Sequence, residues 1–181
     1  MRILLVISSI IFLTSCWDKP RPSSREAVNG YIPIYSSRED AKVITYINNA
    51  MPVVIPGNIY AKGNYIYQLD IGKGIHVIDN SSPSQAHRVG FITVNGSSQI
   101  AIKGNNLYTN SYDELVVLDI SNSSTVNVVK RVPGAFPEGY SNYYYVQPIE
   151  SGYYRCPTSD QLDSVVVGWK TGKVWNTCHT N

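Results

Sequence analysis

Charged residues are scarce in this sequence of 181 residues: Asp, Glu, Lys and Arg make up 15% of it, and the formal net charge is +2. The basic residues are scattered singly, so they form no stripe that would follow a phosphate backbone, and we expect no nucleic acid partner. Long apolar runs are also lacking. The run over residues 3–13 has 11 residues and is too short to cross about 30 Å of hydrocarbon as a helix.

Catalytic motifs are absent from the sequence as well. The three histidines lie far apart: His76 alternates with apolar residues, His87 follows a turn, and His179 is near the end of the chain. No G-x-S-x-G sequence is present to place a serine nucleophile beside one of them. We interpret each histidine as a packed or solvated side chain, and we predict that the protein is not an enzyme and needs no cofactor.

Two short patterns favour structure over chemistry. Asp113 and Glu114 are the only adjacent acidic pair in the repeats described below, and a solvated turn explains them most simply. A glycosidase needs two carboxylates aimed across one cleft, which a sequence cannot place. The glycines of Gly72-Lys73-Gly74 are not followed by a helix, so we do not expect a phosphate site there.

The N-terminus has the features of an export signal. Arg2 precedes the apolar run, which has the length of a signal h-region, and Leu13-Thr14-Ser15-Cys16 follows directly. These four residues resemble the lipobox of bacterial lipoproteins, although an ordinary cleaved signal also has small residues at its cut. The resemblance implies that residues 1–15 are removed and that Cys16 carries acyl chains, palmitate among them. Three chains are enough for stable anchoring to a membrane.

Residues 16–29 are expected to tether the domain to the lipid. This stretch has no strand pattern, and Pro20 and Pro22 favour an extended chain. Trp17 occupies the position after the lipidated cysteine, where Asp would favour retention in the inner membrane. By resemblance to the sorting of bacterial lipoproteins, in which this position decides between the two membranes, we expect the protein in the cell envelope, at the outer membrane.

The other two cysteines, Cys156 and Cys178, are predicted to form a disulfide in an exported protein. The loop between them spans 22 residues. The alternative is a metal site of these two residues with His179, but the paired spacing of structural zinc ligands is missing. We therefore expect no metal.

A repeat of about 40 residues organises the middle of the chain. Residues 59–67 resemble residues 100–108, and residues 74–79 resemble residues 114–119, so that the second copy is one residue shorter in the break between the two parts. This period is expected of a propeller blade with four strands. With 14 Tyr against 3 Phe and 43% hydrophobic residues, the composition also predicts an all-β fold.

Turn residues recur within the repeat. Gly63-Asn64 and Gly104-Asn105 are placed where a tight hairpin needs positive φ, and Asp79 and Asp119 can cap the backbone of the turns that they begin. The strands before these aspartates are apolar on both faces, which predicts a sheet packed between neighbours.

The pentapeptide Leu115-Val-Val-Leu-Asp119 nearly matches the signature of the bacterial LVIVD-repeat β-propeller lipoproteins, and Ile75-His-Val-Ile-Asp79 is a variant of it. The resemblance covers residues 31 to about 136 and implies a propeller at the cell surface, without catalytic residues. Residues 31–35 and 41–47 are expected to form half a repeat. With two full copies, we expect residues 30–137 to form a propeller-like stack whose ring is small, incomplete or irregular.

Residues 138–181 are predicted to form a β-rich C-terminal module, either a separate module or a degenerate closing blade. Short β runs are expected at residues 141–146, 152–156 and 163–169. Aromatic rings are concentrated here, and they pack in a core or form a platform for a glycan or a peptide. The candidate platform residues are Tyr143, Tyr145, Tyr153, Trp169 and Trp175.

Two functions are compatible with these features. The first is a membrane-anchored envelope lipoprotein that serves as a non-enzymatic platform for binding or assembly with a protein partner. The second is a carbohydrate-binding or glycan-processing envelope protein, which would need a cleft with carboxylates beside exposed Tyr or Trp.

Overall fold

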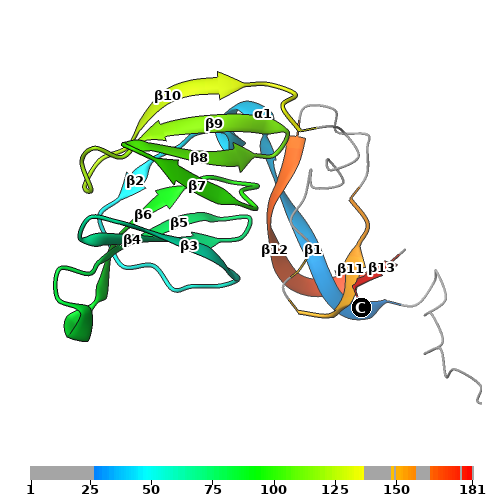
Figure 1. The fold of residues 1–181 in the computed structure, drawn as a ribbon. Helices are drawn as coiled ribbons and strands as arrows, with labels where there is room; N and C mark the ends of the chain where they lie inside the picture. Colours follow the sequence, from blue (N-terminus) through cyan, green and yellow to red (C-terminus); the bar gives the residue numbers. More distant parts are fainter. Residues whose placement is uncertain (1–26, 137–147, 149, 158–163, 176, 181) are drawn as a thin grey trace, which may run out of the picture.

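The computed structural model describes residues 27–136, 148, 150–157, 164–175 and 177–180. Cys16, Tyr143 and Tyr145 lie outside the described residues, as does the β run expected at residues 141–146. The described strands form three open sheets, and the helices have one turn each, so the predicted all-β class is confirmed (Figure 1).

Each repeat forms a meander of four antiparallel strands. We call the two meanders the first and the second blade. The first blade contains β3 (Pro56–Lys62), β4 (Tyr65–Asp70), β5 (Gly74–Asp79) and β6 (His87–Thr93), with the short 3-10 helix η1 (Pro83–Gln85) before β6. The second blade contains β7 (Ile100–Lys103), β8 (Asn106–Ser111), β9 (Glu114–Asp119) and β10 (Asn127–Val132).

Two turns have the same local geometry in both repeats. Gly63 and Gly104 have φ of 58° and 60°, which suits the first position of a type II′ hairpin, whereas Asn64 and Asn105 do not have the positive φ that the sequence suggested. Asp79 accepts a hydrogen bond from the backbone N–H of Ser81 at 2.8 Å. The same capping bond joins Asp119 to Ser121, also at 2.8 Å.

The outer strands share a β-bulge. Val89 in β6 and Val129 in β10 are skipped in the pairing with β5 and β9, at equivalent places in the two blades. A bulge bends its strand and increases the local twist. The repeat therefore specifies an irregularity of the sheet as well as its regular pairing.

The blades stack through opposite faces of the repeat. Ile75 and Val77 of the first blade belong to the same buried cluster as Val116 and Leu118 of the second. By position in the repeat, Val116 corresponds to His76 and not to Ile75. One face of the first blade thus meets the other face of the second, and each fully buried aliphatic side chain contributes about 1.5–3 kcal/mol.

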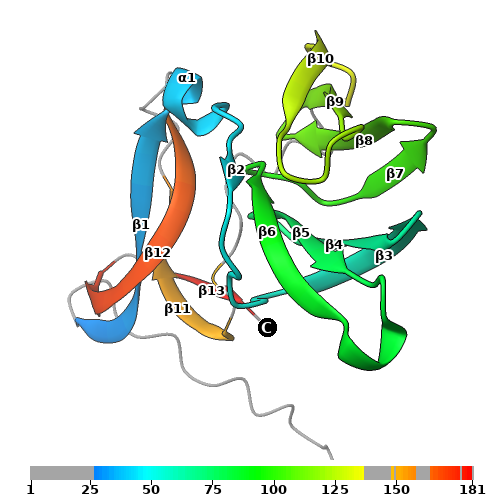
Figure 2. The same ribbon diagram turned by 90° about the vertical axis from the view of Figure 1, so that its left-hand side faces the viewer.

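The third sheet combines the two ends of the described chain in the strand order β12-β1-β11-β13. Its strands are β1 (Val28–Ser37), β11 (Gly152–Arg155), β12 (Ser164–Val174) and β13 (Thr177–Thr180). Figure 2 places this sheet to one side of the stacked blades, with the chain between α1 (Arg38–Ala41) and β3 running between them.

The predicted half repeat at residues 31–47 is wrong in its first part. β1 pairs along its whole length with β12 and at Tyr31 with β11, not with a blade. Only β2 (Tyr46–Ile47) joins the first blade, beside β6. Strand pairing therefore crosses the boundary expected between residues 30–137 and 138–181. An apolar strand can pair with the free edge of any sheet, so the sequence of β1 does not determine which strand it pairs with.

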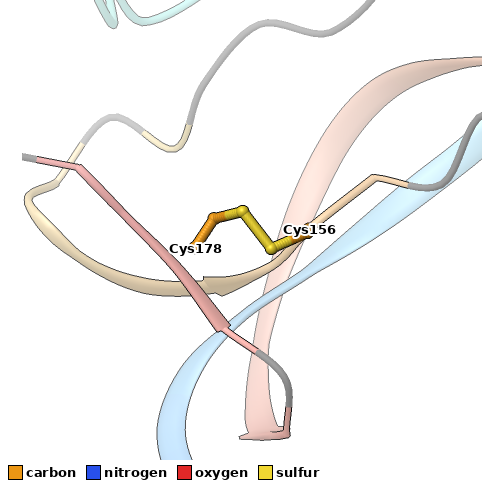
Figure 3. Close-up of a disulfide and its surroundings, with 2 residues drawn as sticks. All are labelled: Cys156 and Cys178. Atoms are coloured by element: carbon orange, nitrogen blue, oxygen red, sulfur yellow. A yellow bond between two sulfur atoms is a disulfide. The ribbon is translucent and has the colours of Figure 1, made fainter. Parts of the chain in front are cut away.

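A disulfide joins Cys156 to Cys178, with the two Cα atoms 5.2 Å apart (Figure 3). It links the end of β11 to β13, its antiparallel neighbour. Closing a loop of 22 residues stabilises the fold by about 3 kcal/mol on the chain-entropy account. Because both sulfurs are used in the bond, the alternative metal site with His179 is wrong.

Candidate ligand cleft

The same strand of the third sheet, β12, lies beside equivalent turns of the two blades. In the first blade the turn between β4 and β5 is formed by residues 71–73, and in the second the turn between β8 and β9 is formed by residues 112–113. The residue missing from the second repeat is missing here. The two turns differ in sequence, and they meet β12 in different ways.

The second turn is filled by Tyr112. Its φ of 54° is in the left-handed region, which is unfavourable for an aromatic residue and must be held by its surroundings. The ring is 7% exposed and packs with Ala41 of α1 and Val165 of β12. Burial raises the pKa of the Tyr112 hydroxyl to about 12. This ring joins the second blade to the third sheet.

Glu114 reinforces that joint. Its carboxylate accepts hydrogen bonds from Lys42 Nζ at 2.5 Å and from Arg131 Nη1 at 3.1 Å, and Arg131 Nη2 donates to the carbonyl of Lys42 at 2.6 Å. Burial raises the pKa of Glu114, but the hydrogen bonds from the two cations outweigh it and leave the pKa below its ordinary value. Glu114 is therefore a structural anchor, not the solvated turn residue that the sequence suggested.

The first turn leaves a cleft of about 280 Å³ between the first blade and the third sheet. Ile71, Gly72 and Lys73 form one side and residues of β12 the other. The complete lining is Tyr31, Ile55, Ile71, Gly72, Lys73, Pro148, Glu150, Val167, Gly168, Trp169 and Thr171. Most of its surface is apolar, with a few polar groups, as in typical small-molecule sites.

The polar groups of the cleft come from both sides. Tyr31 donates its hydroxyl to Glu150 Oε2 at 2.7 Å, a bond that raises the pKa of Tyr31. Lys73 is half-buried, and its ammonium has no hydrogen-bond partner within the part of the chain that the structure describes. Glu150 and Thr171 are exposed, so they mark the opening of the cleft.

A buried pair, Asp70 and His76, holds one wall of the cleft. Asp70 accepts hydrogen bonds from the backbone N–H groups of Val54 and Ile55, at 3.0 and 2.7 Å, and so fixes the position of Ile55. His76 Nε2 lies 3.3 Å from Asp70 Oδ2, and its side chain is inaccessible to solvent. Burial lowers the pKa of His76 despite the opposing effect of Asp70. The interpretation of His76 as a packed histidine is confirmed.

The described candidates for an aromatic platform do not form a single surface. Trp169 is half-buried and lines the cleft, and its ring makes a T-shaped contact with the ring of Tyr154, with the two centroids 5.4 Å apart. Tyr153 packs at 5.0 Å against His179, and Trp175 is 47% exposed beyond the end of β12. The platform stays a prediction, with Trp169 as the member that lines the cleft.

Sequence reasoning missed most of the cleft residues. Tyr31, Lys73 and Glu150 are far apart in the sequence and occur in no motif. The available signal was the difference of one residue between the two breaks, which marks the two turns as unlike. Among the residues that the structure describes, no three His, Cys, Asp or Glu side chains cluster as metal ligands would, and no helix is long and apolar enough to span a membrane.

The LVIVD repeat family matches residues 56–92 and 96–133. These ranges cover β3 to β6 and β7 to β10, the strands of the two blades. The chain contains two LVIVD repeats. Each LVIVD repeat is therefore one propeller-like blade, and β1, β11, β12 and β13 lie outside the repeats. No match was found among curated proteins or among solved structures.

Proposed function

We propose that this LVIVD-repeat protein is a membrane-anchored envelope lipoprotein and serves as a non-enzymatic platform for binding or assembly. The cleft between the first blade and the third sheet is its binding site. The lipobox-like residues 13–16 support the anchor, and the cleft supports the binding role.

The cleft carries this proposal because apolar walls converge there with polar groups from both sides, among them Lys73, whose ammonium has no hydrogen-bond partner in the described part of the chain. Three acidic residues elsewhere, by contrast, act within the fold. Asp79 caps its own turn, Glu114 joins the second blade to residues near α1, and Asp70 fixes the chain before β3. A site of this kind suits recognition of a ligand or partner.

Pull-down from solubilised envelopes tests the binding role. The bait is the full chain, compared with Val167→Phe, which fills the cleft, and with Lys103→Met, a control at an exposed position of β7. We expect a partner that the wild type and the control recover and that Val167→Phe loses. Recovery that is equal for all three, or no recovery under several growth conditions, contradicts the proposal.

The anchor is tested separately by labelling cells with a palmitate analogue. Wild-type protein should take up the label and remain with the outer membrane fraction, whereas Cys16→Ala should do neither. Mass spectrometry that finds an unmodified cysteine at the mature N-terminus would overturn the anchor without affecting the cleft.

A carbohydrate-binding or glycan-processing role is the second candidate, favoured by Trp169 and Glu150 in one cleft. Among the described residues that line the cleft, Glu150 is the single carboxylate, whereas glycoside hydrolysis uses two. This observation favours binding over hydrolysis. A glycan array separates the candidates: binding that Trp169→Ala abolishes supports the glycan, and an empty array supports the first proposal.

A further inference from the structure

The two blades provide an internal comparison at the cleft. In the second blade, the space between the β8–β9 turn and β12 is occupied by the ring of Tyr112. In the first blade, the equivalent turn has Ile71, Gly72 and Lys73, and a cleft remains against the continuation of β12. The contact between the second blade and β12 is thus filled by an aromatic ring of the chain itself, whereas the equivalent place in the first blade is open.

The size of the cleft suits such a ring. Its volume is about 280 Å³, whereas an apolar cavity of about 150 Å³ already holds benzene. The additional space is sufficient for a short substituent on the ring. Larger ligands usually occupy sites of about 300–1,000 Å³, so the cleft fits a small molecule.

The walls are of the kind that an aromatic ring contacts favourably. Ile55, Ile71 and Val167 supply aliphatic surface, and Trp169 supplies an aromatic one. Trp169 makes a T-shaped contact with Tyr154, at an interplanar angle of 79°. A ring bound beside Trp169 can pack against it with an offset or an edge.

The charges indicate what the ring should carry. The carboxylate of Glu150 already accepts the hydroxyl of Tyr31 at 2.7 Å. The ammonium of Lys73, by contrast, has no hydrogen-bond partner among the described residues. Lys73 is a half-buried residue that lines the cleft beside apolar walls, and its ammonium is complementary in charge to an anionic group on a ligand.

We propose that the cleft binds a small aromatic carboxylate, with its ring between Ile71, Val167 and Trp169 and its carboxylate on Lys73. The inference rests on the proposed binding role and names the chemistry of the ligand. The carboxylate can belong to a free small molecule or to the C-terminal aromatic residue of a peptide.

Calorimetric titration of the full chain in detergent tests this ligand class. The probes are 3-phenylpropionate, its neutral alcohol 3-phenylpropan-1-ol, and a tripeptide that ends in phenylalanine. We expect 3-phenylpropionate to bind roughly tenfold or more tightly than the alcohol, because only the acid forms a charged hydrogen bond. Tighter binding of the tripeptide than of 3-phenylpropionate assigns the peptide source, and the reverse assigns the free acid.

Three variants identify the site. Lys73→Met keeps the apolar stem but removes the charge, so it should weaken the acid roughly tenfold and leave the alcohol unchanged. Val167→Phe should abolish binding of both, and Thr171→Trp, at an exposed position of the opening, repeats this test if Val167→Phe fails to fold. Lys103→Met should bind as the wild type does.

Equal affinity for acid and alcohol, or acid binding that survives both the Lys73→Met and the filling substitutions, overturns the inference. Failure of every probe to bind overturns it too. The proposed function is judged by other results: a partner that is recovered by wild type and lost by Val167→Phe keeps the platform even when no aromatic acid binds.

Discussion

The turn of the first blade and the turn of the second have the same place in the repeat but different tasks. The second has Tyr112 and Glu114, a buried ring and a buried carboxylate that bind it to α1, β12 and Lys42. The first has Gly72 and Gly74 at the positions equivalent to Tyr112 and Glu114, and it borders a cleft. In duplicated blades, one copy can thus be used for structural support while the other is available for a ligand.

The largest expected effect comes from emptying the filled turn. Tyr112→Ala removes the ring between Ala41 and Val165 and should lower the free energy of unfolding by about 4 kcal/mol, the usual cost of deleting a buried aromatic side chain. Urea unfolding of the oxidised protein measures it. Tyr112→Phe keeps the ring and should cost less than about 1.5 kcal/mol. A loss of similar size for Tyr112→Ala would show that the ring does not hold the second turn against α1 and β12.

The first turn is expected to be sensitive for the opposite reason, lack of space. Gly74 has φ of 148°, and a Cβ atom there would lie 2.0 Å from the carbonyl oxygen of Ile92. Gly74→Ala should therefore cost about 3 kcal/mol through strain and overpacking. Thermal unfolding of Gly74→Ala and Glu114→Ala, the equivalent pair, tests this point. Wild-type stability of Gly74→Ala would contradict the close contact.

Removing the disulfide tests the sheet against which both turns pack. The double variant Cys156→Ala, Cys178→Ala should lose about 3 kcal/mol or less, because a 22-residue loop is freed in the unfolded chain. Since β11 pairs with β1 at Tyr31, which lines the cleft, the double variant should also bind a ligand in the cleft less tightly, whereas the side chains around Tyr112 should stay packed. Equal free energies of unfolding for the oxidised wild type and the double variant would contradict the stabilising role of the disulfide.

The smallest expected effect concerns the charge on Glu114. Glu114→Gln should cost about 1–2 kcal/mol at pH 7, since the amide keeps one acceptor oxygen but replaces the other with an N–H donor, so that one of the bonds from Lys42 and Arg131 is lost and the other has a neutral acceptor. Because the pKa of Glu114 in the folded protein lies below its ordinary value of 4.5, its contribution is complete above that pH and is lost as the pH falls through the folded pKa. Urea unfolding between pH 7 and pH 3 should show a steeper loss for the wild type than for Glu114→Gln. Parallel curves would show that the carboxylate is not stabilised.

The repeat region could be predicted because local residues determine its turns. Gly63 and Gly104 specify the hairpins, and Asp79 and Asp119 cap theirs, so two copies of the same residues give two copies of the same blade. The partner of β1 could not be predicted, since pairing between residue 31 and residue 171 leaves no local trace in the sequence.

The candidate site was largely unpredictable for a related reason. Cys156 and Cys178 could be paired because oxidised cysteines have few partners to choose from. Trp169 was recognised only as one ring among many. Lys73 and Glu150 gain their meaning from the approach of the first blade to the third sheet, which depends on packing and not on a motif.

The head-to-tail contact between the blades has a consequence for the length of such proteins. Ile75 of one blade and Val116 of the next lie on opposite faces of the repeat but belong to the same buried cluster, so every unit contains both halves of the joint. A joint of this heterologous kind does not terminate itself. Duplication of about 40 residues can therefore add a blade that packs through the surfaces already present. The number of blades is then limited by the segments that cover the two ends of the array.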